Sequence, residues 1–153
     1  MRLEQFFNSA GLRAIDVWRE AGLLPSNGSE VLSGKYNPSY RFMEQVFRAT
    51  DGKVPPNTWF PQLFEGIEDV PACLDFRSYI KAERVTAISV WRAASILPSY
   101  GSDVVNRRKP PSYKFMEAVC RHTRCIVQPD SWFPVVFEGR SEGVSSERGE
   151  FRS

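Results

Sequence analysis

The sequence repeats itself at a fixed distance of 73 residues. Trp18 matches Trp91, the run 38–44 matches the run 111–117, and the run 59–61 matches the run 132–134. About 29 of the 53 positions from residue 14 to residue 66 are identical to their partners, without an insertion or deletion. Such a repeat constrains the architecture first, because each copy must form the same unit. We therefore expect two small modules, a first copy (residues 1–70) and a second copy (residues 71–139).

The two copies differ from the last segment of the chain in composition. Residues 140–153 hold Gly, Ser, Arg and Glu with few apolar side chains, which predicts a disordered tail. The join between the copies, residues 67–71, is too short for a free tether. Two modules of about 65 residues, each marginal alone, would gain stability by packing on each other.

Apolar residues within each copy recur at spacings of three and four, which indicates amphipathic helices. In the first copy the pattern predicts helices over residues 3–10, 14–21, 26–33 and 40–50, and the second copy agrees. Tyr40, Met43, Val46, Phe47 and Thr50 form the expected inner face of the fourth helix. No strand-like alternation occurs, so the predicted class is all-α with four to five helices in each copy.

A proline-broken aromatic segment, which we call the strap, follows the fourth helix in each copy. We expect residues 54–64 to be extended with one turn of helix. One interpretation is that each strap closes the core of its own copy. The other is that Trp59, Phe60, Trp132 and Phe133 pack the straps on each other, or on a second chain in self-association.

The cysteines and the single histidine could suggest a metal site. Cys120, His122 and Cys125 form a Cys-x-His-x-x-Cys group, but the first copy has Phe47, Ala49 and Gly52 there. Structural zinc takes four ligands, usually as two spaced pairs. We expect packing or surface chemistry here, with no metal and no cofactor.

Several protein classes are disfavoured by the sequence. No apolar run reaches the roughly 20 residues of a membrane helix, and the N-terminus lacks the apolar segment of a signal peptide. The expected location is the cytoplasm, at the nucleoid if the chain binds DNA. No phosphate-binding glycine motif occurs, and His122 has no nucleophile pattern around it. We therefore expect a protein that is not an enzyme.

The segment from residue 17 to residue 54 resembles the helix-turn-helix domains of phage Cro and repressor proteins (Xre-like). The resemblance is carried by Gly22-Leu23-Leu24-Pro25-Ser26, by Val31 to Ser39 with its Gly34-Lys35-x-x-Pro38-Ser39, and by the ending Ala49 to Val54. The second copy retains Val104, Pro111, Ser112 and Thr123 but has lost both glycines. The resemblance covers about 38 residues of each copy and implies a second motif helix that enters the DNA major groove.

One position departs from that family, which usually has a small residue four positions before the turn glycine. Here that residue is Trp18, and Trp91 in the second copy. We expect the indole to widen the crossing of the two motif helices, or to shift their register so that Ala21 and Ala94 make the close contact.

The resemblance implies specific DNA contacts on the second motif helix and just beyond it. Side chains there bind base edges, whereas nearby cations bind phosphates. The alternative is an exposed polar helix that is merely solvated. The implied base contacts are Ser26, Asn27, Ser29, Glu30, Ser33, Ser99, Tyr100, Ser102, Asp103 and Asn106. The implied phosphate contacts are Lys35, Arg41, Arg107, Arg108, Lys109 and Lys114.

Charge separates the two copies. Residues 1–72 hold seven Lys and Arg against nine Asp and Glu, a net −2, whereas residues 73–139 hold ten against six, a net +4. Because phosphate neutralisation supplies much of DNA affinity, the second copy is the better expected DNA binder.

Two functional classes remain. The first is a sequence-specific, double-stranded DNA-binding transcriptional regulator of phage or mobile-element type, built as a covalent pseudo-dimer. The second is a helix-turn-helix scaffold whose acidic first copy binds and inhibits a partner protein, as antitoxins or anti-activators do. The polar motif helices favour the first class, and the balanced charge of the whole chain, +2, favours the second.

Overall fold

The computed structural model describes residues 3–136, with side chains from residue 5 onwards, and this part of the chain is all-α. The predicted fold class is confirmed at that level, since residues 3–136 contain helices and turns but no strand. The predicted tail, residues 140–153, and Phe137 of the second strap lie outside the described residues. None of the helices described has the length and hydropathy required to cross a bilayer.

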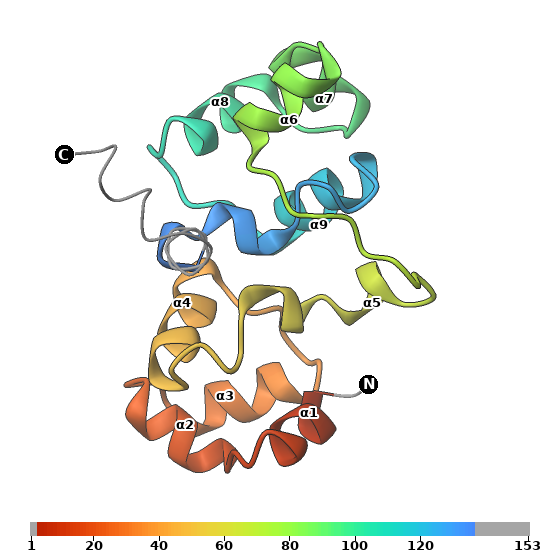
Figure 1. Ribbon diagram of the computed structural model, residues 1–153. Coiled ribbons are helices and arrows are strands. Elements are labelled where there is room, and N and C mark those ends of the chain that lie inside the picture. Colours follow the sequence, from red (N-terminus) through yellow and green to blue (C-terminus); the bar gives the residue numbers. More distant parts are fainter. Residues whose placement is uncertain (1–2, 137–153) are drawn as a thin grey trace, which may run out of the picture.

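The helices of the two copies follow each other in the same order (Figure 1). In the first copy they are α1 (Leu3–Ser9), α2 (Ala14–Glu20), α3 (Pro25–Leu32), α4 (Tyr40–Ala49), the 3-10 helix η1 (Pro56–Trp59) and α5 (Pro61–Phe64). In the second copy they are α6 (Phe76–Glu83), α7 (Ala87–Ala93), α8 (Pro98–Val105), α9 (Tyr113–His122) and η2 (Pro129–Trp132). The 73-residue offset of the sequence therefore recurs in the helix positions.

Local sequence explains where the longer helices begin. Ser39 and Ser112 cap α4 and α9, because each hydroxyl accepts the backbone N–H three residues later at 3.1 Å. Pro25 and Pro98 occupy the first turn of α3 and α8, where a missing N–H costs nothing. The strap is more helical than the sequence predicted, since it holds η1 and α5.

Each copy has an aromatic core around one buried tryptophan. In the first copy the Trp18 ring lies 5.7 Å from the Phe7 ring and 5.6 Å from the Phe42 ring, measured between centroids. Trp59 of the strap closes this core, since it contacts Phe7 and Phe42 edge-on. Phe42 is 3% exposed but was not on the predicted inner face of its helix. The buried face of α4 is therefore wider than the single row of residues that the sequence predicted.

The straps also join the two copies through reciprocal aromatic contacts. Tyr40 stacks on Phe133 at 4.2 Å between ring centroids, and Tyr113 stacks on Phe60 at 4.1 Å. The Tyr40 hydroxyl donates to the carbonyl of Trp132 at 3.1 Å, and the Tyr113 hydroxyl donates to the carbonyl of Trp59 at 2.9 Å. Since each contact maps onto the other by the 73-residue offset, the interface is isologous, like that of a twofold dimer.

Polar groups at the centre of this interface obey the same reciprocity. The backbone N–H of Asn57 donates to the Asp130 carboxylate at 2.8 Å, and the backbone N–H of Asp130 donates to the Asn57 side-chain oxygen at 2.9 Å. The Asn57 amide also donates to Gln128 at 2.9 Å. Asp130 is only 2% exposed, so these bonds satisfy polar groups that water does not reach.

Both interpretations of the strap are therefore correct, because each strap closes its own core and packs on the other. Trp59, Phe60 and Phe133 are 2%, 0% and 0% exposed within one chain. They are not available to a second chain in this structure. The predicted packing of the straps on each other is thus observed within the chain, whereas self-association with a second chain stays a prediction, with Trp132 half-buried.

The cysteine and histidine group does not converge on one point. Cys120 and Cys125 are buried, whereas His122 is exposed. Burial raises the pKa of the Cys120 thiol, with Cys125 and Cys73 adding to the effect. The Cys125 thiol donates to the carbonyl of Leu63 at 3.4 Å, so this side chain packs at the interface between the copies.

Candidate nucleic-acid interface

Helix α3 packs directly on α2 at a glycine. A Cβ atom at Gly28 would lie 2.3 Å from the Trp18 indole, so only glycine allows the observed approach. The second copy repeats the arrangement, since a Cβ atom at Gly101 would lie 2.4 Å from the Trp91 indole. Glycine inside a helix costs about 1 kcal/mol relative to alanine, and the close contact explains why both copies have it.

This packing corrects the expectation for Trp18 and Trp91. The sequence suggested a wider helix crossing or a shift towards Ala21 and Ala94. Instead, the small residue lies on the other helix of the pair, at Gly28 and at Gly101. The large residue of the contact therefore lies on α2 and the small one on α3, the reverse of the family pattern. Helix α3 stays close to α2, and its opposite side remains open to solvent.

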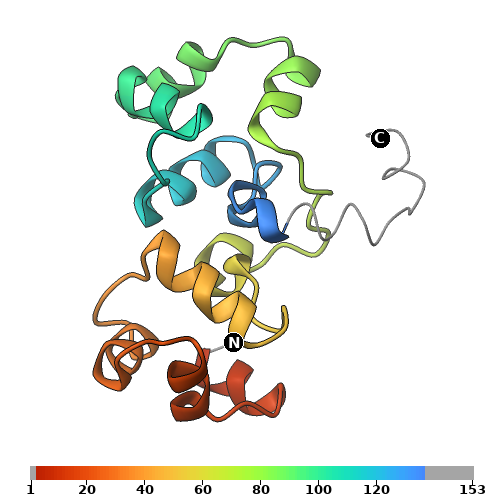
Figure 2. The same ribbon diagram turned by 90° about the vertical axis from the view of Figure 1, so that its left-hand side faces the viewer.

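The predicted base-contact residues lie mainly on that open side. Most are exposed, whereas Glu30, Tyr100 and Asp103 are half-buried. The exposed ones are Ser26, Asn27, Ser29, Ser33, Ser99, Ser102 and Asn106. Helices α3 and α8 lie in opposite halves of the molecule, with α4, α9 and the straps between them (Figures 1 and 2).

The two acidic candidates already have cationic partners. The Glu30 carboxylate lies 3.2 Å from the ammonium group of Lys35. The equivalent Asp103 carboxylate lies 3.5 Å from Arg108 and 3.7 Å from Lys109. Each acid closes the end of its helix, because its backbone carbonyl also accepts the N–H of the residue five positions later. A DNA contact by these residues would require the ion pairs to open.

Four other candidates make side-chain hydrogen bonds within the protein, and for Ser102 this is the bond that its hydroxyl accepts from the Asn106 amide at 3.3 Å. The Tyr100 hydroxyl accepts the backbone N–H of Ser112 at 3.0 Å and donates to the carbonyl of Pro110 at 3.3 Å, so it ties α8 to the loop before α9. The Asn106 side-chain oxygen accepts from Arg77 at 3.1 Å. The Ser33 hydroxyl donates to the carbonyl of Glu30 at 3.0 Å.

All six predicted phosphate contacts, Lys35, Arg41, Arg107, Arg108, Lys109 and Lys114, are exposed. Arg41 and Lys114 lie in the first turns of α4 and α9, at equivalent positions. The others follow α3 and α8. The turn there is left-handed in both copies, with φ of 88° at Gly34 and 60° at Arg107.

Sequence reasoning missed two features of this surface. Leu24 and Leu97, immediately before α3 and α8, are 72% and 73% exposed, and neither was among the predicted contact residues. Arg77 of α6 reaches the end of α8, where it donates to the Val105 carbonyl at 3.5 Å. The identity of Leu24 and Leu97 was visible at the 73-residue offset, but their exposure was not.

Comparison of the chain with protein-family models, with curated proteins and with solved structures finds no match in any of the three.

Proposed function

We propose that this chain is a double-stranded DNA-binding regulator that acts without catalysis, built from two helix-turn-helix domains in one chain. In this proposal α3 and α8 are the recognition helices, in domains 1–70 and 71–139. The observation that carries it is the pair of equivalent helices with open polar sides, held by a twofold-like interface. Dimeric helix-turn-helix proteins present their recognition helices to half-sites one DNA turn apart, about 34 Å.

Two features of the exposed helices support base reading over simple solvation. Asn27 can pair with an adenine edge, whereas Asn106 would first have to release Arg77 and Ser102, and each good contact of this kind discriminates by about 1–3 kcal/mol. Leu24 and Leu97 add an exposed apolar group beside them, and such groups contact the thymine methyl. The Tyr100 hydroxyl, by contrast, is occupied within the protein.

Titration of labelled DNA fragments at several salt concentrations, read by fluorescence anisotropy, tests the proposal. Replacing Arg108 and Lys109 by alanine should lower affinity for every sequence and flatten the salt dependence by about 0.9 for each phosphate that is no longer neutralised. Asn27→Ala should instead relax sequence preference while the salt slope stays unchanged. Lys81→Ala removes an exposed cation of α6 outside the proposed set and serves as the control.

The ion pairs of Asp103 supply a sharper variant. Asp103→Asn removes the acid that pairs with Arg108 and Lys109, so both cations become free for phosphates. We expect tighter DNA binding and a steeper salt dependence. Weaker binding with an unchanged slope would mean that Asp103 itself contacts DNA, as the family resemblance suggested.

The protein-binding alternative retains one specific observation, the net −2 charge of the first copy. It predicts that no fragment is retained at physiological salt and that substitutions in the acidic copy abolish function. Absence of salt-sensitive DNA binding, together with one stoichiometric protein partner, would reverse the ranking.

A further inference from the structure

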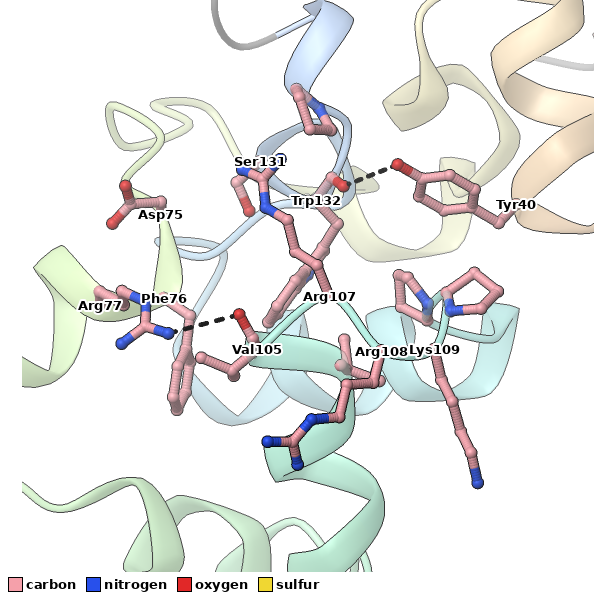
Figure 3. Close-up of a pocket in the computed structure, with 14 residues that line it drawn as sticks. Tyr40, Asp75, Phe76, Arg77, Val105, Arg107, Arg108, Lys109, Ser131 and Trp132 are labelled. Carbon is pink, nitrogen blue, oxygen red and sulfur yellow. Dashed lines mark hydrogen bonds between the residues drawn. The ribbon is translucent and has the colours of Figure 1, made fainter.

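A pocket of about 330 Å³ lies at the junction of the two copies (Figure 3). Tyr40 contributes one wall from the first copy, and the other walls come from α6, the end of α8, the loop after it and η2. The aromatic part of the lining comprises Tyr40, Phe76 and Trp132. The pocket borders the proposed DNA surface, since Arg108 and Lys109 are among its lining residues.

The charge that faces this pocket is positive. Figure 3 shows Arg107 extending from its loop towards Ser131, and Arg77 lying near the end of α8. Among the described side chains, residues 5–136, no carboxylate lies within 4.0 Å of either guanidinium group, although Arg77 already donates to the Val105 carbonyl and to the Asn106 side chain. Asp75 is the acidic lining residue, and its carboxylate already caps α6 by accepting the Ser78 N–H at 2.7 Å.

The neighbouring cations have a different orientation. Arg108 and Lys109 line the same loop, but their charged ends point away from Arg107 in Figure 3 and pair with Asp103. Two groups of cations are therefore separable. Arg108 and Lys109 belong to the proposed DNA surface, whereas Arg77 and Arg107 belong to the pocket.

The duplication provides an internal comparison for this pocket. Its apolar parts recur in the first copy, where Trp59 and Pro38 match Trp132 and Pro111. Its cations do not recur, because Gly34 stands where the second copy has Arg107, and Glu4 stands where it has Arg77. The two copies thus share the apolar lining residues, whereas the two arginines occur only in the second copy.

Arg107 has this position at a conformational cost. Its φ is 60°, in the left-handed region, where the equivalent Gly34 has φ of 88°. A side chain in that region costs roughly 1–2 kcal/mol, which glycine avoids. Glycine serves the same turn in the first copy, and Ser95 and Cys125 likewise stand at positive φ where the first copy has Gly22 and Gly52, so the case for Arg107 rests on its place in the pocket rather than on its backbone.

We propose that the pocket binds a small organic anion that carries a planar ring. The guanidinium groups of Arg77 and Arg107 would bind its phosphate or carboxylate, since both oxyanions match the arginine fork. The ring would lie against the half-buried aromatic side chains of Tyr40 and Trp132. A ligand bound there would contact both copies, because Tyr40 comes from the first copy and the other lining residues from the second.

Adenosine monophosphate is a suitable probe, with adenosine as the neutral control and inorganic phosphate as the ringless one. Calorimetric titration of the full chain, without DNA, should show binding of the monophosphate and at least about tenfold weaker binding of either control. The indole NMR signal of Trp132 should shift during the titration. Equal binding of inorganic phosphate would overturn the requirement for a ring, and absence of monophosphate binding would overturn the site.

Arg107→Gly is the decisive variant, because it restores the residue of the first copy and relieves the strained turn. It should fold at least as stably as the natural chain and bind the probe at least about tenfold more weakly. Arg77→Gln should also weaken probe binding, but because Arg77 holds Asn106 of the proposed DNA surface, the separation of the two sites rests on Lys109→Gln and on Arg107→Gly. Lys109→Gln removes a cation that points away and should leave probe binding intact. Unchanged probe binding by Arg107→Gly would refute the proposal.

Discussion

The contact between Gly28 and Trp18 makes Gly28→Ala an informative substitution. Two physical effects predict opposite changes in its free energy of unfolding. Gly28→Ala lies inside α3, so helix propensity alone predicts a stabilisation of about 1 kcal/mol. The added Cβ atom would instead lie 2.3 Å from the Trp18 ring, whereas carbon atoms in contact prefer about 3.5–4.0 Å. The helix or the indole must therefore move by more than about 1 Å.

The surroundings oppose that movement. The Trp18 ring is 2% exposed and lies between the rings of Phe7 and Phe42, at centroid distances of 5.7 and 5.6 Å. Overpacking of a core costs about 1–3 kcal/mol, and we take the upper end because a rigid ring receives the clash. After subtraction of the propensity gain, Gly28→Ala should lower the free energy of unfolding by about 2 kcal/mol.

Urea unfolding monitored by tryptophan fluorescence measures this change. Ser29→Ala, at the next and exposed position of α3, is the matched control and should stay within about 0.5 kcal/mol of the natural chain. Gly101→Ala should behave like Gly28→Ala, because its Cβ atom would meet Trp91 at 2.4 Å. A stabilised Gly28→Ala variant would refute the close contact and would instead support a wider crossing of α2 and α3.

The interface between the copies gives three further expectations. Tyr113→Phe should cost about 1 kcal/mol of unfolding free energy, because the carbonyl of Trp59 loses its 2.9 Å hydrogen bond. Asn57→Ala should cost about 2 kcal/mol in the same assay, since it leaves the buried N–H of Asp130 without its 2.9 Å acceptor. Burial raises the pKa of Tyr40 and Tyr113 above the ordinary value of 10.0. Their contribution to the free energy of unfolding is therefore complete below pH 10 and falls at higher pH, because the phenols then ionise in the unfolded chain before they do so in the folded one. A Tyr40→Phe/Tyr113→Phe double variant should therefore show a shallower alkaline loss of stability than the natural chain, as measured by urea midpoints.

Helix positions followed from the sequence because the duplication gave two independent readings of each segment. The predicted helix 40–50 is observed as 40–49, and 26–33 as 25–32. Phe42 was missed for a physical reason. A single stripe of spacing three and four describes a helix with one buried side, but α4 packs on its own copy through Phe42 and on the second copy through Tyr40.

The candidate site was only partly readable from the sequence. The exposure of Asn27 and Ser29 could be predicted from the helical pattern. The role of Gly28 could not, because the close contact of this glycine with the Trp18 indole is seen only in the three-dimensional structure. The ion pair of Glu30 with Lys35 joins residues five apart across a turn, outside the regular helical spacings.

The same interface shows that the two copies are not interchangeable. Asn57 and Asp130 occupy equivalent positions and face each other, so an interface between two second copies would bring two buried carboxylates together. Like charges in a buried site are strongly unfavourable, whereas Asn57 supplies a neutral partner. A pair of second copies is therefore disfavoured, whereas the observed pair of one first and one second copy has no such repulsion. The exposed sides of α3 and α8 also differ in sequence. Asn27 and Ser33 of the first copy stand where the second copy has Tyr100 and Asn106. A symmetric dimer reads two identical half-sites, so under the proposed function this chain is suited to a DNA site whose halves differ in sequence.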